Sequence, residues 1–465
     1  MKRTIFNMRF SFNIVLCFLS LNTFAGDLKI GAAAVKITPP TGTPMAGYYY
    51  DRGADDVHDD LFAKAMVLEK DGARVAVISC DLISVPAEIV STVRALVEKN
   101  TDISADHVMV SATHSHTGPV MPKRIDRYKN LQNATYIKYL SELPAMIAES
   151  ARLANSALAE TKISIGKGYE ESISFNRRFF MTDGNVGWNP GKMNPMIIKP
   201  AGPIDPEVFV LYAETTDGKP VATYVNFALH LDNVGGTEIS ADMPYTLSTI
   251  LGLVKGKDMV TLFAQGCSGN INHINVKTKE AQKGHGEAQR IGTVLSGEVL
   301  KTYTRLKPLD ITGISAKREI VKLQLPDISP DELPKAQEVI SRIGKPDAPK
   351  FLELVNAHKV VDVLDRKGKP VEAEIQVIAL GEDCAIVSLP GEIFTEIGMY
   401  IKSRSPYPYT MVVELANGSI GYIPDRKAYI EGNYEPVSSR VAPGSGEILA
   451  ERALKLLNEM KSSRM

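Results

Sequence analysis

Residues 111–119 read SATHSHTGP and place two histidines, His114 and His116, directly after the apolar run Val108–Val110. This run predicts a buried strand, and residues i and i+2 of a strand point to the same face of a sheet. Both imidazoles are therefore expected to reach one metal ion or one substrate bond at the carboxyl end of the strand, where open α/β sheets usually bind ligands. A metal site there would indicate a hydrolase whose remaining ligands lie elsewhere in the chain.

The composition of the chain excludes some classes of partner. The 465 residues include 53 basic and 54 acidic side chains, and the net charge is −1. This balance gives no electrostatic reason to expect nucleic acid or an anionic membrane surface as a partner. The hydrophobic content of 44% is normal for a globular protein with a substantial core.

The first 25 residues predict a cleaved secretory signal peptide. Basic residues precede an apolar stretch from about Phe10 to Leu21, and Ala25 offers a small residue at the cleavage site. The apolar stretch is short for a membrane span. Val15-Leu16 before Cys17 does not resemble a lipoprotein cleavage site. We expect a secreted or periplasmic protein with no stable membrane span; the oligomeric state is left open.

Cysteine usage narrows the choice of metal ligands. The mature chain keeps Cys80, Cys267 and Cys384, an odd and sparse set that argues against a disulfide framework. The sequence has no Cys-x-x-Cys pair, so a thiolate zinc site is not expected. Histidine, carboxylate and tyrosine side chains remain as candidate ligands.

Strand and helix patterns alternate along the chain and predict an α/β, or mixed α+β, fold with a large mixed sheet flanked by helices and a site at the strand ends. We expect a single domain over residues 26–465 without internal repeats, and residues 305–375 are a candidate appended lobe. Residues 182–206 are rich in Gly, Pro and Asn and predict a long functional loop. Strands are expected at 31–38, 61–68, 75–79, 108–112, 208–214, 221–227, 259–264, 374–380, 385–389 and 411–415, and helices at 87–98, 136–155, 286–304, 330–343, 393–403 and 446–460.

Two further polar residues follow apolar runs. His230 comes after residues 222–229 and before a Gly-rich turn, so it is either a metal ligand or a capped core residue. Glu392 follows Pro390-Gly391 at the end of another run, and it is either a ligand or a solvated carboxylate at a helix N-terminus.

The remaining histidines and one small-residue segment carry weaker signals. His273 also ends a strand-like run, whereas the other four histidines sit in polar surroundings and are expected on the surface without partners; they are His58, His107, His285 and His358. Residues 263–272 run from a strand into small residues, which either let backbone amides approach a substrate or ion or form an ordinary turn.

Taken in order, these segments resemble the neutral/alkaline non-lysosomal ceramidases. Residues 111–119 match the hallmark segment of that family, and the resemblance covers nearly the whole mature chain. The other matching segments are Gly47-Tyr48, Leu61–Ala65, Ser79–Leu82, Asn176-Arg177, Phe227–His230, Ser240–Asp242, Pro390–Glu392, Asn417–Tyr422, Tyr429 and Tyr434-Glu435.

The resemblance implies a Zn²⁺ site formed by His114, His230, Glu392 and Tyr429. Imidazole, carboxylate and phenol oxygen are plausible ligands for this ion, which lowers the pKa of a bound water and polarises a scissile carbonyl. His116 is expected to orient the site or to transfer a proton.

The resemblance also implies roles for residues around the metal. Arg177 is expected to stabilise a developing oxyanion or to hold a polar substrate group, with Arg178 as the alternative. Four further residues are candidates for substrate binding, namely Gly47, Tyr48, Asn270 and Asn272.

The chain departs from the family at three points. Val441 stands where the family has a second active-site tyrosine, Asn270-Ile271-Asn272 stands where it has Asp-x-Ser, and the sequence stops at Met465 before an immunoglobulin-like domain could fit. These differences leave the substrate open. The expected function is a secreted zinc-dependent amidohydrolase acting on a ceramide-like lipid or another small N-acyl compound. The alternatives are an esterase or glycan-processing hydrolase on the same scaffold, and a non-catalytic binding homologue.

Overall fold

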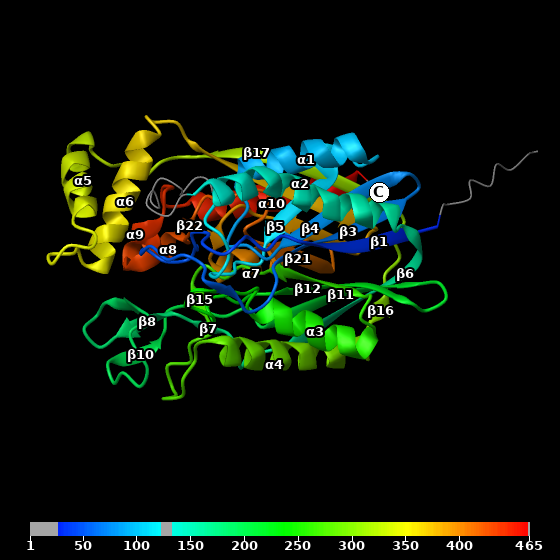
Figure 1. The fold of residues 1–465 in the computed structure, drawn as a ribbon, viewed down its shortest axis with the longest axis horizontal. Helices are drawn as coiled ribbons and strands as arrows, with labels where there is room; N and C mark the ends of the chain where they lie inside the picture. The colour runs from blue at the N-terminus through cyan, green and yellow to red at the C-terminus, as the bar shows by residue number, and fades with distance from the viewer. Residues whose placement is uncertain (1–26, 122–132, 464–465) are drawn as a thin grey trace, which may run out of the picture.

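A computed structural model describes residues 27–121 and 133–463, so the signal peptide expected at residues 1–25 lies outside the described residues. The fold consists of three similar units (Figure 1). Each unit has three antiparallel strands, then a helix, then a fourth strand that pairs parallel to the third, and finally a closing helix.

The first unit follows from clear local signals. Asp71 and Gly72 both have positive φ values, 51° and 81°, and form the tight turn between its second and third strands. The Asn133 side chain accepts a hydrogen bond from the Tyr136 backbone and caps the closing helix. The elements are β1 (Lys29–Lys36), β3 (Phe62–Lys70), β4 (Ala73–Cys80), α1 (Ala87–Asn100), β5 (Val108–Ala112) and α2 (Ala134–Ser156).

The second and third units repeat this order of elements. The second unit comprises β6 (Ala159–Tyr169), β11 (Glu207–Thr215), β12 (Pro220–Phe227), α3 (Met243–Lys255), β14 (Val260–Gln265) and α4 (His285–Tyr303). The third comprises β17 (Ile314–Leu323), β18 (Val371–Leu380), β19 (Cys384–Ser388), α7 (Thr395–Arg404), β21 (Tyr409–Val413) and α10 (Ser445–Ser462). Pairing of β1 with β6 joins the first two units into a nine-stranded sheet that also includes β16 (Lys307–Pro308), and the third unit forms a separate four-stranded sheet.

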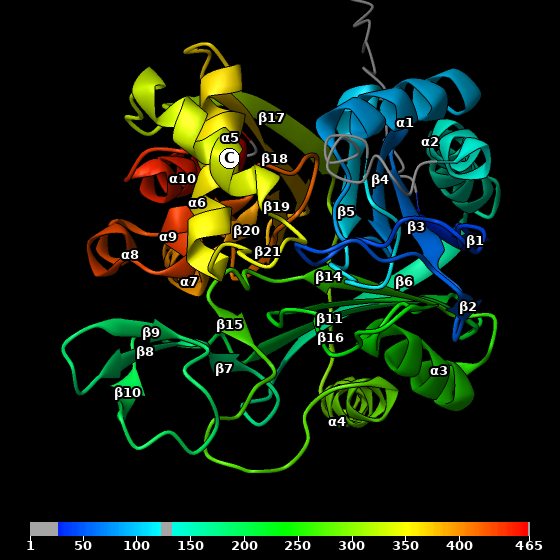
Figure 2. The same ribbon diagram turned by 60° about the vertical axis from the view of Figure 1, so that its left-hand side comes forward.

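One central core holds the three units together. It contains one face of the nine-stranded sheet and one face of the four-stranded sheet, for example Met66, Leu211 and Ile386. The opposite faces pack against the unit's own helices, so Val67, the neighbour of Met66 in β3, lies in a different core with α1 and α2. Figure 2 shows the three groups of helices placed around the strands. The expected mixed α+β class with helix-flanked sheets is confirmed.

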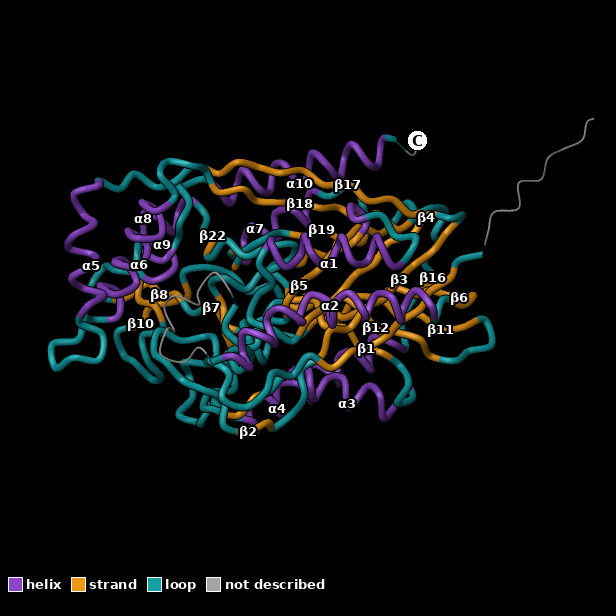
Figure 3. The backbone as a smooth tube through the Cα atoms, turned by 45° about the horizontal axis from the view of Figure 1, so that its top comes forward, coloured by secondary structure: helices purple, strands orange, loops and turns teal. Residues whose placement is uncertain are grey.

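Segments between the repeated elements carry short additional structure (Figure 3). The expected loop at 182–206 contains two strands of a small sheet, and residues 324–370 leave the third sheet to form a helical pair. These elements are β8 (Arg178–Met181), β9 (Val186–Trp188), β10 (Ile197–Pro200), α5 (Leu333–Ser341) and α6 (Phe351–Asp365). The shortest elements are β2 (Asp56–Val57), β7 (Phe175–Asn176), β13 (Glu238–Ile239), β15 (Ile271–Asn272), β20 (Glu392–Ile393), β22 (Tyr422–Ile423), α8 (Arg426–Glu431) and α9 (Tyr434–Ser438).

Among the described residues, no helix combines the length and the apolar composition needed to cross a membrane.

Candidate metal centre

The candidate ligands lie at the carboxyl ends of the parallel strand pairs. His114 and His116 follow β5, His230 follows β12, and Glu392 follows β19. All four residues are buried, with exposed fractions between 3% and 9%. The three units thus deliver their polar loops to one point of the molecule, as expected for parallel strands that end at the same sheet edge.

The two neighbouring histidines meet by a different route from the one expected. The strand β5 ends at Ala112, and His114 has φ 75°, so the same-face rule for strands does not apply to the pair. The turn nevertheless brings Nε2 of His116 within 3.3 Å of Nε2 of His114. Gly47 packs against this turn with φ 103°, and a Cβ atom there would lie 2.7 Å from the His116 ring. Only glycine therefore fits at position 47.

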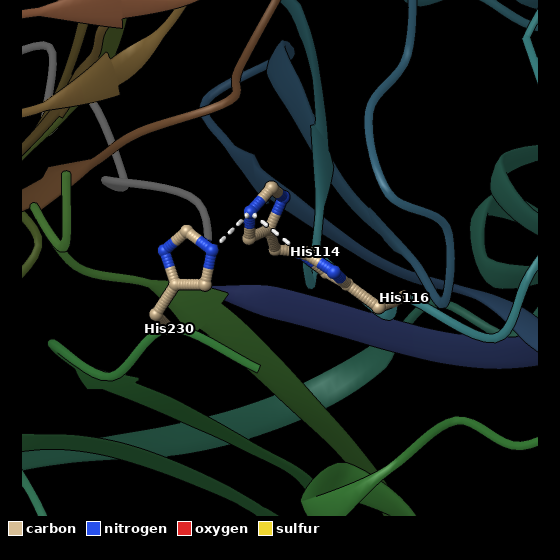
Figure 4. Close-up of side chains that lie close together, drawn as sticks. All are labelled: His114, His116 and His230. Carbon is tan, nitrogen blue, oxygen red and sulfur yellow. Dashed lines mark hydrogen bonds between the residues drawn. The ribbon is translucent and has the colours of Figure 1, made fainter. Parts of the chain in front are cut away.

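Three imidazole nitrogens and a carboxylate oxygen converge on one point. Nε2 of His114 lies 3.1 Å from Nε2 of His230 (Figure 4). It lies 3.6 Å from Oε2 of Glu392. Nδ1 of His114 lies 2.8 Å from the Ile83 carbonyl oxygen. Because a carbonyl only accepts, Nδ1 carries the proton and Nε2 presents a lone pair. A tetrahedral zinc ion with Zn–N bonds of about 2.0–2.1 Å separates its ligand atoms by roughly 3.3 Å. The observed separations therefore fit such an ion.

The protonation states of two imidazoles also suit a metal. Burial lowers the pKa of His116 to about 3, against the opposing effect of Asp232. Burial, followed by the neighbouring His114, lowers the pKa of His230 well below its ordinary value. Both rings are therefore neutral near pH 7, which is the form that binds metal ions.

The structure gives the tyrosine position to a different residue. The hydroxyl of Tyr429, the expected ligand, donates to the Val441 carbonyl at 2.9 Å and lies 2.8 Å from Oγ of Ser439. The phenol beside Glu392 is Tyr422, because β20 and β22 pair Glu392 directly with Tyr422. Burial, and then the Glu392 carboxylate, raises the pKa of Tyr422 well above its ordinary value.

Arg177 lies next to this group of side chains, whereas Arg178 binds the neighbouring segment that carries Glu431 and Glu435. The Arg177 guanidinium lies 5.4 Å from the Tyr422 ring centroid and donates to Glu435 at 2.8 Å. Arg178 donates to the other oxygen of Glu435 at 2.9 Å and to Glu431 at 3.1 Å. Glu435 is fully buried between the two arginines and so fixes the direction of Arg177.

The four candidate substrate-binding residues fall into two groups. Gly47 and Tyr48 lie beside His116, and the Tyr48 hydroxyl donates to Asp232 at 2.6 Å. Asn270 donates to Glu396 at 2.7 Å, and Asn272 donates to Asn189 at 2.9 Å. Both asparagine amides are thus engaged within the protein, and their role in substrate binding stays a prediction.

An aromatic cluster adjoins the phenol side of the site. Trp188 stacks on Phe351 with ring centroids 5.4 Å apart and lies 4.4 Å from the Tyr434 ring. Tyr434 in turn contacts Tyr422 at 5.3 Å. These rings come from β9, α6 and α9, so the expected functional loop at 182–206 reaches the surroundings of the site.

Comparisons with known proteins relate the sequence to one family and the fold to two solved structures. Residues 28–243 match the model of the family Neutral/alkaline non-lysosomal ceramidase, N-terminal. The resemblance to this family is confirmed. Two solved structures are similar to this chain, and each similarity shows that the fold is shared. Neutral ceramidase from Pseudomonas aeruginosa has a TM-score of 0.74 and 18% identity, over 94% of this chain and 75% of that one.

The second similar structure is a ceramidase complexed with C2, with a TM-score of 0.72 and 16% identity, over 94% of this chain and 76% of that one. No curated protein matches the sequence.

Three functional groups of the site were not predicted from the sequence. They are Tyr422, the Ile83 carbonyl and Glu435, which bonds to both arginines. The sequence carries one signal for Tyr422, which closes the matching tract Asn417–Tyr422, but this signal alone does not favour Tyr422 over Tyr429.

Proposed function

We propose that the protein is a zinc-dependent amidohydrolase that cleaves the N-acyl bond of a ceramide-like lipid. The observation that carries the proposal is the convergence of the His114 and His230 Nε2 atoms, 3.1 Å apart, beside the buried Glu392 carboxylate. In this proposal His114, His230, Glu392 and Tyr422 hold the ion, and Tyr422 replaces the expected Tyr429. The family match and the two ceramidase structures support the choice of substrate class.

When bound, a zinc ion supplies Lewis-acid polarisation of the scissile carbonyl and lowers the pKa of a coordinated water. His116 then acts as the proton carrier of the reaction. Its ring is neutral near pH 7 because it is buried, and its Nε2 lies 3.3 Å from the His114 nitrogen. His116 accepts a proton from the attacking water and returns it to the leaving nitrogen, which an amide needs more than an ester does.

Arg177 supplies the positive charge for the transition state. Its guanidinium stays charged at any working pH, and the buried Glu435 holds it in place beside Tyr422. A preorganised donor aimed at a developing oxyanion is worth about 10²–10³ in rate. The aromatic cluster of Trp188, Phe351 and Tyr434 offers an apolar surface for a hydrocarbon chain of the substrate.

We also propose that the protein is exported, to the periplasm or the cell exterior. The basic start, short apolar stretch and small residues of the first 25 positions support this. Amino-terminal sequencing of the protein recovered from its native host tests it. A start near Gly26 is expected, and a mature protein that retains Met1 would overturn the export proposal.

Metal analysis combined with a hydrolysis panel tests the proposed activity. We expect the purified chain to bind zinc and to release fatty acid from N-acyl-sphingosines faster than from matched O-acyl esters. His230→Gln should lose both the zinc of this centre and the hydrolysis, while the control His107→Gln, whose ring bonds to the Arg74 carbonyl away from this centre, should keep both. A folded, zinc-loaded chain that cleaves only esters would replace the amidase by an esterase. One that cleaves neither would leave a binding protein.

A further inference from the structure

Two histidines that were expected to be isolated surface residues meet outside the candidate metal centre. The rings of His58 and His285 stack, with centroids 3.6 Å apart and an interplanar angle of 9°. Each ring also contacts a carboxylate. Nδ1 of His58 lies 2.8 Å from Oδ2 of Asp59, and Nε2 of His285 lies 3.0 Å from Oε2 of Glu238.

These four side chains come from three segments that are distant in sequence. His58 and Asp59 directly follow β2, Glu238 begins β13, and His285 is the first residue of α4. Figure 3 shows β2 and α4 next to each other at the edge of the molecule. The strands β2 and β13 pair over only two residues each, so backbone hydrogen bonds alone hold this junction weakly.

We propose that His58, Asp59, Glu238 and His285 form a second binding site for a divalent transition-metal ion, with Zn²⁺ as the matching ion. Donor atoms of His58, Asp59 and His285 all lie within 4.8 Å of one another. Two imidazoles with carboxylates are a common donor set for zinc. The two carboxylates carry two negative charges, which a divalent ion neutralises.

Binding of the ion requires a change of one ring. A metal lies in the plane of each imidazole that binds it, and two stacked rings with an interplanar angle of 9° have no such point near both of them. The His58 side chain is 40% exposed, so its ring can rotate toward the ion at little cost. Asp59 is the fixed ligand, because its side chain is only 2% exposed and both of its oxygens accept hydrogen bonds.

The buried carboxylate connects this second site to the turn of His116. Asp59 accepts hydrogen bonds from Oγ of Ser240 at 2.6 Å and from the Ala241 backbone at 2.7 Å. The Ser240 carbonyl accepts hydrogen bonds from the hydroxyls of Ser115 at 2.7 Å and Thr117 at 2.9 Å, the residues on either side of His116. An ion bound here is therefore structural, and it fixes the loop on which His116 stands.

The test uses a chain whose first centre has been removed by His114→Gln and His230→Gln. After incubation with ZnCl₂ and exhaustive dialysis, elemental analysis should find about one zinc per folded chain, and zinc should raise its melting temperature as a ligand of the native state does. Adding His58→Gln and His285→Gln should reduce the bound zinc to about zero and abolish the shift. Adding His107→Gln instead should change neither.

A background chain that folds but retains no zinc would overturn the proposal, as would zinc retention that survives loss of His58 and His285. The same pair of substitutions in the otherwise unchanged chain gives a second measurement, with an expected fall from about two zinc ions to about one. The site does not depend on the proposed hydrolysis. An inactive chain that still loses one zinc with His58→Gln and His285→Gln would refute the amidase and support the second site.

Discussion

The assignment of the phenol ligand can be tested with two matched substitutions, Tyr422→Phe and Tyr429→Phe. Both remove one hydroxyl in the same part of the chain, from the buried Tyr422 and the half-buried Tyr429. The structure places Tyr422 opposite Glu392 in the β20–β22 pair, whereas the Tyr429 hydroxyl is bonded to Ser439 and Val441. The two substitutions should therefore affect different properties of the protein.

The magnitudes follow from these contacts. Loss of outer-shell partners of a metal ligand already costs about 10–100-fold in metal affinity or activity, so loss of a direct ligand in Tyr422→Phe should cost about 100-fold or more. That factor corresponds to about 2.7 kcal/mol of transition-state stabilisation. Tyr429→Phe removes the hydrogen bonds of this hydroxyl with Val441 and Ser439 and leaves the Val441 carbonyl the longer 3.4 Å bond from Oγ of Ser439, which should cost about 1–2 kcal/mol of folding stability. For a chain of this length, that lowers the melting temperature by about 1–2 °C.

The assay is zinc affinity by competition with a chelator, together with kcat/KM on an N-acyl-sphingosine and a melting curve for each variant. Tyr422→Phe should lose zinc affinity and activity together, and Tyr429→Phe should stay within about twofold of the parent in both. The reasoning would be refuted if Tyr429→Phe lost zinc while Tyr422→Phe kept it. It would fail equally if both variants bound zinc as the parent does.

Three further predictions follow from the described contacts. Glu435→Gln should lower kcat more than it raises KM, because Arg177 stays present but is no longer held by a full charge; unchanged kinetics would contradict the positioning role. Lys402→Met should cost about 3–5 kcal/mol of stability, measured by denaturant melts, because it removes the ammonium partner of the largely buried Asp205 and leaves Glu207 with Lys167 alone. Burial opposes the shift, yet the ammonium groups of Lys402 and Lys167 hold the pKa of Glu207 below its ordinary value. These ion pairs stabilise the protein above about pH 4.5, and the stabilisation is lost as the pH falls further. The Lys402→Met variant should therefore lose less stability on acidification than the parent does. Trp188→Ala should reduce kcat/KM for long acyl chains by about tenfold and leave short-chain substrates nearly unchanged, and an equal loss for both would exclude a chain-binding role.

The elements predicted best from the sequence are those with local signals. The strand at 108–112 and the hairpins around Asp71-Gly72 and Asp217-Gly218 are confirmed within a few residues, because tight turns and apolar runs fix them locally. The strand β6 and the helix α3 were not predicted. The first alternates buried and exposed residues among polar side chains, and the second starts from the Asp242 cap, whose positive φ of 62° no pattern indicates.

The candidate site was likewise predicted only in part from the sequence. The His-x-His segment identified the centre, although by a strand geometry that the structure does not have. The choice between Tyr422 and Tyr429 could not be made from spacing, because both lie in the matching tract and only strand pairing brings Tyr422 to Glu392. The stacking of His58 and His285 could not be predicted from the sequence either, because 226 residues lie between them and neither belongs to a local motif.

The threefold repetition of the fold explains why ligands so distant in sequence converge. The parallel pairs β4–β5, β12–β14 and β19–β21 end in equivalent registers, at Cys80 with Ala112, Phe227 with Gln265, and Ser388 with Val413. The segments after the third strands of the units contribute the Ile83 carbonyl, which orients His114, then His230, and then Glu392.

The segments after the fourth strands complete the site. One of them supplies histidines of the site itself, and the other two supply groups that hold neighbouring residues in place. The first unit supplies His114 and His116 after β5. The second supplies the Gly269 carbonyl, which accepts a hydrogen bond from Arg177 at 2.7 Å. The third supplies Glu414, which accepts from the Ile393 backbone at 2.6 Å, next to Glu392. Each unit therefore contributes at least one residue from each of its two parallel strand ends. Because the units repeat strand order and register rather than sequence, this arrangement is visible only in the folded chain.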